Sequence, residues 1–151
     1  TNSGADVIIL ELEDFTPPAE RPAARARVAE VLAAWRAQGA VVAVRINPLE
    51  TDDGLADLAA AIAAGPDAVL LPKVGDPAQV VRLELEVERL EEANGLTAGV
   101  TELVPNMELA RGLIQTFEIC QVSKRISGAL VASEDMAADL DIGIPPAPPP
   151  C

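Results

Sequence analysis

Histidine and tyrosine are absent from this 151-residue sequence, and its aromatic residues are limited to two phenylalanines and one tryptophan. The lack of histidine removes the commonest general base and the commonest transition-metal ligand. Any catalysis must therefore depend on carboxylates, arginine, lysine or a hard cation. With so few aromatic side chains, the core must be built from alanine, valine, leucine and isoleucine, which suits helices packed closely on a sheet.

Basic residues are also scarce, since 11 lysines and arginines stand against 24 acidic residues and the formal net charge is −13. This charge repels nucleic acid and anionic membranes, so we expect neither as a partner. Cys120 and Cys151 alone do not make a disulfide framework, and we expect a reducing, cytoplasmic setting. No apolar run is long enough for a transmembrane helix.

Short apolar runs recur along the chain, and each ends in or is closely followed by ionisable residues. Uninterrupted apolar runs are typical of parallel strands covered on both faces. Charges at the carboxyl ends of such strands indicate a functional site. The runs and their charges are residues 7–10 with Glu11, Glu13 and Asp14; 41–44 with Arg45; 68–71 with Lys73; 103–104 with Glu108; and 128–131 with Glu134 and Asp135.

Segments with helical periodicity separate these runs, and residues 136–140 form a further short helical stretch. Their alternation with the strands predicts an α/β fold with a parallel sheet. The sheet is either open and doubly wound or part of a (β/α)₈ barrel, which needs about 250 residues when complete. No glycine-rich loop follows the first strand, which disfavours dinucleotide binding. The predicted inward faces are Val28, Val31, Leu32 and Trp35; Leu55, Leu58, Ala59 and Ile62; Val80, Leu83, Val87 and Leu90; and Leu113 and Phe117 in a helix over 109–121.

Glu108 and Asp135 are the first candidate pair, because each follows one of two consecutive strands. Neighbouring strands lie about 4.8 Å apart, so both carboxylates can reach one ion. Two carboxylates that leave the other positions to water and substrate oxygens are typical of a magnesium site. The alternative is that Asp135 caps the following helix and that Glu108 is a solvated acid in a first helical turn.

Basic side chains near the same edge have two readings each. Arg45 is expected to point into the mouth of the sheet, where it either binds a carboxylate, pairs with the acidic cluster Glu11, Glu13 and Asp14, or does both. The cluster is expected to take part in catalysis with Arg45, either by ordering metal-bound water or by balancing the charge of Arg45. The alternative is a solvated loop. Lys73 either contacts a phosphate or carboxylate or lies on the surface. Arg21 and Arg25 are expected on the exposed face of the first helix.

Five motifs, spanning most of the chain in order, together resemble the HpcH/HpaI aldolase and citrate lyase β-subunit family, in particular its citryl-, malyl- and citramalyl-CoA lyases. The resemblance implies a TIM barrel in which Glu108 and Asp135 bind Mg²⁺ and Arg45 binds the carboxylate of the substrate. We also expect Lys73 and Glu108 to contact the substrate. It also implies cleavage, or the reverse condensation, of a 3-hydroxyacyl-CoA to a 2-oxo acid and an acyl-CoA. Without histidine, the chain is unlike the pyruvate-aldolase branch. The motifs are residues 10–14, 44–48, 71–74, 107–112 and 133–140.

By comparison with that family, the chain lacks the first strand and everything after the sixth. We therefore expect an incomplete (β/α)₈ barrel of about five βα units, strands 2–6 of the family barrel, over residues 1–143. Residues 144–151 contain five prolines and are expected to form a disordered or polyproline tail. A full-length member is expected to form homo-oligomers. The alternative to a lyase is a catalytically inactive partial barrel that at most binds a metal ion or a partner.

Overall fold

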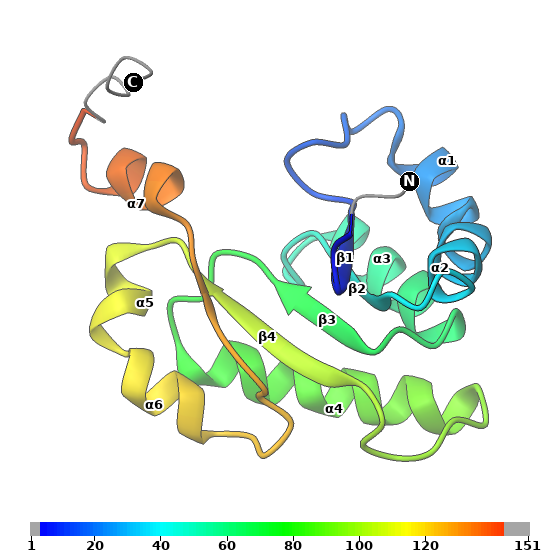
Figure 1. The fold of residues 1–151 in the computed structure, drawn as a ribbon. Helices are drawn as coiled ribbons and strands as arrows, with labels where there is room; N and C mark the ends of the chain where they lie inside the picture. The colour runs from blue at the N-terminus through cyan, green and yellow to red at the C-terminus, as the bar shows by residue number, and fades with distance from the viewer. Residues whose placement is uncertain (1–3, 144–151) are drawn as a thin grey trace.

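The structure is a computed structural model, and it describes residues 4–143 of the chain. Within that range, strands and helices alternate (Figure 1). The strands are β1 (Val7–Glu11), β2 (Val41–Arg45), β3 (Ala68–Leu71), β4 (Glu102–Met107) and β5 (Leu130–Val131). The helices are α1 (Arg21–Ala26), α2 (Val28–Arg36), α3 (Asp52–Ala63), α4 (Pro77–Ala93), α5 (Ala110–Ile114), α6 (Thr116–Gln121) and α7 (Ser133–Asp139).

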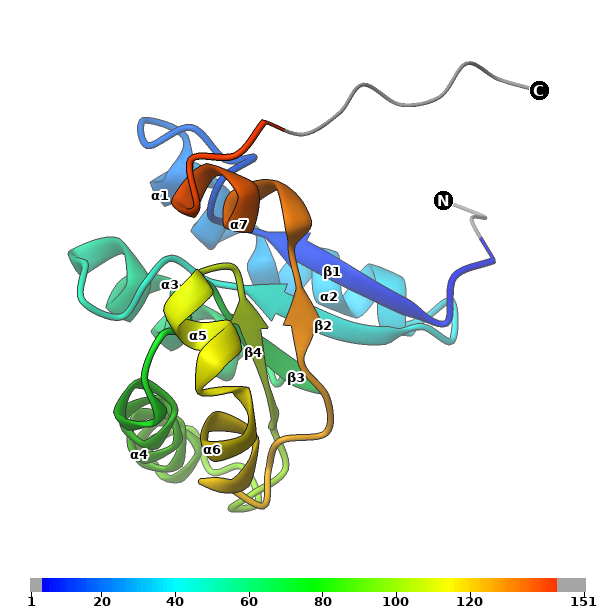
Figure 2. The same cartoon turned by 90° about the vertical axis from the view of Figure 1, so that its left-hand side faces the viewer.

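The five strands of residues 4–143 run parallel in one sheet, and their order in the sheet is their order in the chain. A doubly wound sheet reverses its strand order part-way, whereas a (β/α)₈ barrel adds each strand beside the last. The sheet is therefore an arc of a barrel, which confirms the predicted fold class. Figures 1 and 2 show that helices α1 to α6 lie along one side of this arc, while α7 lies beyond the end of the strands.

Three strands begin at the first residue of their apolar run, whereas β4 begins one residue earlier, at Glu102, and β5 begins two residues later, at Leu130. Parallel pairing places Glu11 beside Arg45 at the ends of β1 and β2, and Met107 beside Val131 at the ends of β4 and β5. The carboxyl ends of all these strands therefore lie at the same edge of the sheet, together with the charged residues that follow them.

The core lies between the sheet and helices α1 to α6, and it is aliphatic, as the composition predicts. Leu12, Leu32, Val44, Ile62 and Leu103 are among its fully buried side chains. In α4, all four residues predicted to face inward are buried. The helix begins at a capping box, in which Asp76 accepts a hydrogen bond from the N–H of Ala78 at 2.8 Å and pairs with Gln79.

The other face of the sheet, which lines the inside of a closed barrel, is left uncovered by the helices of residues 4–143 (Figure 2). Val7, Ile9, Val41 and Leu130 line a hollow of about 360 Å³ there and are 42–53% exposed. Parallel sheets are normally covered on both faces. This apolar face is therefore the part of the barrel that the described half leaves open.

Helix α3 is rotated about its axis relative to the prediction. Leu58 is buried as predicted, but Leu55 is 41% exposed and Ala59 is exposed as well. The cause is Gly54, because a Cβ added to it would lie 2.1 Å from the carbonyl oxygen of Pro48. Only glycine fits where the helix meets the loop after β2, so the face that carries Gly54 points inward.

The single helix predicted over residues 109–121 is two short helices, α5 and α6, and the predicted inward face is wrong. Leu113 and Phe117 are 48% and 70% exposed, whereas Ile119 is fully buried. Gly112 decides this orientation, because a Cβ added to it would lie 2.0 Å from the carbonyl oxygen of Val74. The glycine must face the turn after β3, and this turns Leu113 and Phe117 outward.

Arg21 and Arg25, predicted on the exposed face of the first helix, are instead largely covered, with side chains 19% and 17% exposed. Arg21 pairs with Asp53 at 2.9 Å, and Arg25 pairs with Asp53 at 2.8 Å and with Asp57 at 2.9 Å. Helix α1 packs against α3, whose first two turns are acidic. Helical periodicity within α1 carries no information about this neighbour, so the prediction missed it.

None of the helices formed by residues 4–143 is long and apolar enough to cross a membrane. The proline-rich segment 144–151, predicted to be a disordered tail, lies outside the described residues. The domain boundary predicted after residue 143 therefore stays a prediction.

Candidate functional site

Charged side chains from the ends of β1, β2 and β4 meet at the carboxyl edge of the sheet. Arg45 donates a hydrogen bond from Nε to Oε2 of Glu11, its partner in the strand register. Its Nη1 lies 3.6 Å from Oε2 of Glu13 and 3.5 Å from Oε1 of Glu108, and its Nη2 lies 4.0 Å from Oδ2 of Asp14. The ion pair of Arg45 with the acidic cluster, one of the two predicted readings, is therefore present.

The guanidinium of Arg45 keeps donors for a ligand. Its Nη contacts of 3.5–4.0 Å are at or beyond the limit of a hydrogen bond. Since a guanidinium has five N–H donors, those on Nη1 and Nη2 can still bind a planar anion such as a carboxylate. Burial lowers the pKa of Arg45, but the hydrogen bond to Glu11 and the neighbouring carboxylates outweigh this effect and raise its pKa, so the group stays cationic.

Glu108 follows β4, and its side chain is completely buried. Its Oε1 accepts a hydrogen bond from Nδ2 of Asn106 at 3.1 Å, and its Oε2 accepts one from the backbone N–H of Lys73 at 3.0 Å. The alternative that Glu108 is a solvated first-turn acid is therefore wrong. A carboxylate has about four lone-pair positions, so Glu108 retains acceptor capacity beyond these bonds and its contact with Arg45.

Lys73 lies in the left-handed region with φ of 52°, a conformation that costs a non-glycine residue about 1–3 kcal/mol. In it the N–H faces Glu108, while Nζ pairs with Glu13 and lies 3.2 Å from Oδ1 of Asp14. Lys73 is therefore not an unpaired surface lysine. Burial lowers the pKa of Lys73, but the bonds to Glu13 and Asp14 outweigh this and raise its pKa above the usual value.

Two adjacent carboxyls of the cluster have their pKa values pushed apart. Glu13 is only 3% exposed, and its Oε2 accepts no hydrogen bond from the residues that the structure describes. Burial raises the pKa of Glu13, although Lys73 opposes the shift. Burial also raises the pKa of Asp14, but its hydrogen bonds with Lys73 and Glu13 outweigh this and lower it. Such divergence is common where side chains exchange protons.

A buried network behind the cluster was missed by the sequence analysis. Asp57, completely buried in α3, accepts hydrogen bonds from the backbone N–H and the Nδ2 of Asn47 at 3.0 and 2.7 Å, and pairs with Arg25. Nδ2 of Asn47 also donates to the carbonyl oxygen of Leu12 at 2.7 Å. The network thus ties the end of β1 to the end of β2. Its one sequence signal is an acidic residue among the alanines and leucines of α3.

Asp135 reaches the site from the first turn of α7. The N–H of Ala132 donates to the carbonyl oxygen of Met107 at 3.3 Å, and Oδ2 of Asp139 accepts from the N–H of Ala110 at 2.9 Å, which ties α7 to the end of β4 and to α5. The N-cap of α7 is Ala132, and no side chain caps it. The alternative that Asp135 caps its helix is therefore wrong.

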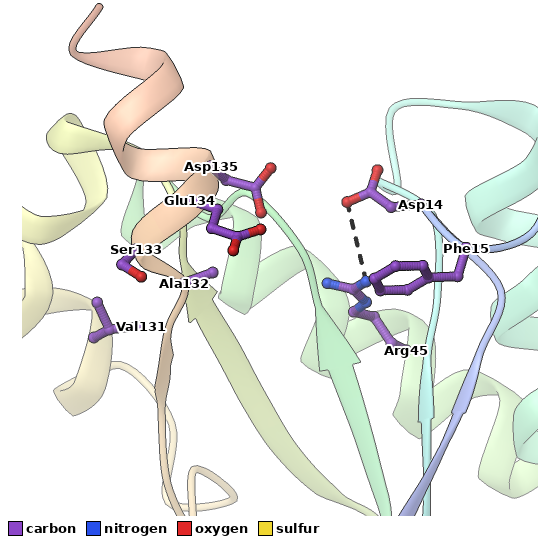
Figure 3. A pocket seen from close by; sticks show the side chains of 8 residues that line it. All are labelled: Asp14, Phe15, Arg45, Val131, Ala132, Ser133, Glu134 and Asp135. Carbon is purple, nitrogen blue, oxygen red and sulfur yellow. Dashed lines mark ion pairs between the residues drawn. The ribbon is translucent and has the colours of Figure 1, made fainter. Parts of the chain in front are cut away.

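A cavity of about 560 Å³ opens between the loop after β1 and the start of α7, within the size range of small-molecule pockets. Figure 3 shows Arg45 and Phe15 on one side and Glu134 and Asp135 on the other. Glu108 touches Arg45 but does not line the cavity, so its convergence with Asp135 on one ion stays a prediction. Within residues 4–143, no three histidine, cysteine or acidic side chains are grouped to hold a metal ion.

The sequence matches the family model described as HpcH/HpaI aldolase/citrate lyase over residues 1–144. The chain belongs to this family. It is 33% identical over 135 residues to citrate lyase subunit beta of Haemophilus influenzae, a match that covers 89% of this chain and 46% of that protein. It is 31% identical over 141 residues to the L-malyl-CoA/beta-methylmalyl-CoA lyase of Rhodobacter capsulatus, which covers 91% and 44% of the two chains.

The chain spans about half the length of the curated relatives it matches. The same holds for a solved structure, the citrate lyase beta subunit of Mycobacterium tuberculosis complexed with oxaloacetate and magnesium. It is similar to this chain with a TM-score of 0.71 at 31% identity, covering 93% of this chain and 54% of that one. Half coverage agrees with the arc of five strands, and the family assignment made from the motifs is confirmed.

Proposed function

We propose that this chain carries the metal- and carboxylate-binding half of a Mg²⁺-dependent carbon–carbon lyase. The reaction is the cleavage of a 3-hydroxyacyl-CoA thioester to a 2-oxo acid and an acyl-CoA, or the reverse. The observation that supports it most is the contact of Arg45 with buried Glu108 at the carboxyl edge of the sheet, where (β/α)₈ enzymes hold their active sites. Because the chain spans half of its relatives, the complete enzyme's activity belongs to the proposal.

The residues present fit a hard divalent cation. Glu108 and Asp135 offer carboxylate oxygens, and Mg²⁺ is usually bound by one or two carboxylates together with water and substrate oxygens. The N–H of Lys73 and Nδ2 of Asn106 already orient Glu108, as outer hydrogen bonds orient metal ligands. Acidic side chains outnumber basic ones around the cavity, so a cation reduces their repulsion. A bound Mg²⁺ supplies a Lewis acid for the oxygens of the oxo acid.

Arg45 is suited to hold the substrate carboxylate beside the reacting carbon. Glu11 fixes its Nε, so the plane of the guanidinium is set and the Nη donors face the cavity (Figure 3). A planar fork binds a carboxylate through two parallel hydrogen bonds. Such binding places the hydroxyl-bearing carbon at a defined position relative to Asp135 and lowers the entropic cost of reaching the transition state.

In the cleavage direction, the hydroxyl on C3 loses its proton to a base and becomes the carbonyl of the 2-oxo acid. The bond between C2 and C3 breaks, and its electron pair moves to C2 and the thioester oxygen as an enolate. A proton added to C2 then completes the acyl-CoA. Arg45 stays bound to the carboxylate on C3 throughout, and its charge stabilises the negative charge that develops on the adjoining oxygen.

Isothermal titration of the chain with Mg²⁺ tests the proposal. The unsubstituted chain is expected to bind Mg²⁺, and Glu108→Gln and Asp135→Asn are each expected to weaken binding at least about tenfold, because each removes a charged ligand. Glu134→Gln is the matched control, since Glu134 is the neighbour of Asp135 in the same turn and is expected to change affinity less than about threefold. Unchanged Mg²⁺ affinity in both ligand variants would remove the metal assignment.

The uncovered inner face of the sheet favours a second candidate, an inactive partial barrel. The two candidates differ in turnover. Release of a 2-oxo acid from citramalyl-CoA or malyl-CoA by this chain alone would exclude the inactive barrel. Mg²⁺ binding that depends on Glu108 and Asp135, without any such release, would favour it over an active half.

A further inference from the structure

Asn106 is a buried amide on the inner face of the sheet, next to Glu108. It is 2% exposed and, by the alternation of β4, lies on the same face as Val104, which lines the inner hollow. Its Nδ2 donates to Oε1 of Glu108 at 3.1 Å, whereas its Oδ1 accepts no hydrogen bond within residues 4–143. Burial of an unpaired acceptor is destabilising, so the favourable contribution of this side chain lies in its bond to Glu108.

The donors around Glu108 are divided unequally between its two carboxylate oxygens. Oε1 accepts from Nδ2 of Asn106 and also faces Nη1 of Arg45 at 3.5 Å, the limit of a hydrogen bond. Oε2 accepts from the backbone N–H of Lys73 at 3.0 Å and from no other donor in the described part of the chain. Each carboxylate oxygen has about two lone-pair positions. Both positions of Oε1 therefore face donors, and one position of Oε2 stays free.

The number of free oxygens on a carboxylate affects which divalent ion it suits. Ca²⁺ takes about six to eight oxygen ligands and often takes both oxygens of one carboxylate. Mg²⁺ is smaller, needs a near-ideal octahedral arrangement and keeps several water ligands. A carboxylate that offers one oxygen therefore suits Mg²⁺, and one that offers two oxygens gives Ca²⁺ a further ligand. Glu108, with Oε1 engaged by Asn106 and Arg45, is of the first kind.

We infer that Asn106 is a specificity-determining residue that restricts Glu108 to one metal-binding oxygen, Oε2, and so favours Mg²⁺ over Ca²⁺. The inference rests on the proposed function, which assigns Glu108 to the metal ion, and adds the residue that decides between ions. Asn106 acts through Glu108, so it is a positioning residue and not a ligand. Of the donors to Glu108, Asn106 is the one to substitute, because Lys73 donates from its backbone and Arg45 is assigned to the substrate.

Titration calorimetry with Mg²⁺ and with Ca²⁺ tests the inference on the unsubstituted chain, Asn106→Leu and Asn106→Ala. The unsubstituted chain is expected to bind Mg²⁺ at least about threefold more tightly than Ca²⁺. Both substitutions free a position on Oε1, so the ratio of the Ca²⁺ to the Mg²⁺ dissociation constant is expected to fall about fivefold or more. If the amide only supported the local structure, its loss would weaken the binding of both ions alike and leave this ratio unchanged.

Thr101→Val is the matched control. Thr101 is completely buried like Asn106, but it lies just before β4, at the opposite end of that strand from Glu108. The substitution also replaces a buried polar side chain by an apolar one, and it is expected to change the ratio of the two dissociation constants less than about twofold. Circular dichroism checks that each variant is folded.

The outcomes distinguish this inference from the proposed function. An unaltered ratio in both Asn106 variants, or Ca²⁺ bound as tightly as Mg²⁺ by the unsubstituted chain, overturns the inference alone. An equal fall of the ratio in Thr101→Val, or loss of the folded state in both Asn106 variants, also overturns it, because the amide then has a structural role. Failure of the unsubstituted chain to bind either ion overturns the proposed function and the inference together. A lower ratio in both Asn106 variants, with the ratio kept in Thr101→Val, supports both.

Discussion

Glu91→Gln is expected to destabilise the protein by about 3 kcal/mol, because Glu91 is a completely buried carboxylate that accepts four hydrogen bonds. It accepts hydrogen bonds from the N–H groups of Gly99 and Thr101 at 2.8 and 3.0 Å, and from Nη1 and Nη2 of Arg125 at 3.1 and 3.0 Å. A glutamine keeps one acceptor oxygen and turns its amide against the other donors. It also leaves Arg125, 10% exposed, without its closest counter-charge.

The magnitude follows from what remains around Arg125. Breaking a buried ion pair by removing one partner costs about 3–5 kcal/mol. Arg125 keeps Glu84 at 3.8 Å and Glu88 at 3.6 Å, so the lower end of that range applies. The carbonyl oxygen of Arg125 accepts from the N–H of Leu103 at 2.9 Å, so the network also joins the segment before β5 to β4. Losing it is expected to loosen the strand that leads to Asp135.

Equilibrium unfolding in urea at pH 7 measures this difference, provided that the transition is two-state. Glu92→Gln is the matched control, since Glu92 is the next residue in α4 and is exposed, and its free energy of unfolding is expected to stay within about 0.5 kcal/mol of the parent chain. A Glu91→Gln protein within about 1 kcal/mol of the parent, or an equal loss in Glu92→Gln, would refute the reasoning.

The ion pair of Glu91 with Arg125 also predicts that the free energy of unfolding depends on pH. Burial raises the pKa of Glu91, but hydrogen bonds from Gly99, Thr101 and Arg125 outweigh this and lower it below its usual value of 4.5. The stability contributed by the charged form is therefore complete above the unfolded pKa and is lost as the pH falls through the lower folded pKa. The gap between the parent and Glu91→Gln is expected to be constant between about pH 7 and pH 5 and to narrow at lower pH.

The remaining predictions concern the buried network and one glycine. Asp57→Asn removes a completely buried charge and is expected to cost about 3 kcal/mol in urea unfolding, whereas Asp52→Asn, exposed in the same helix, is expected to cost less than about 1 kcal/mol; equal losses would contradict this. Gly112→Ala places a Cβ against the carbonyl oxygen of Val74, so it is expected to destabilise the protein by about 2 kcal/mol or more and to lower its thermal midpoint. Gly128→Ala has open space around it and is expected to leave the midpoint nearly unchanged. A Gly112→Ala protein as stable as Gly128→Ala would show that the turn after β3 yields easily.

Strand positions and the location of the site were predictable because both depend on local sequence. A parallel strand covered by helices needs an unbroken apolar run, and β2 and β3 are such runs. The charged residues after each run then fall at the carboxyl edge by the geometry of parallel pairing. Arg45 and the acidic residues after β1 were therefore expected together, and the structure places them in contact.

Partners from distant elements were not predictable. Glu108 is a buried carboxylate and not a solvated acid, and the N–H of Lys73 and Nδ2 of Asn106 orient it. The N–H of Lys73 reaches Glu108 only because β3 and β4 pair. Hydrophobic periodicity also does not resolve which of two adjacent faces of a helix is buried. In α3 and α5, close contact between a glycine and a carbonyl oxygen decides this, and the contacting oxygens belong to other loops.

By itself, the sequence determined the order of strands and helices, the family, and the edge of the sheet that carries the charged side chains, because periodicity, caps and motifs are local features. Only the tertiary structure decided that Arg25 pairs with Asp57 and that Phe15 lies beside Arg45. Such contacts depend on how elements far apart in the chain approach one another, and burial then changes the energy of each charge they bring together.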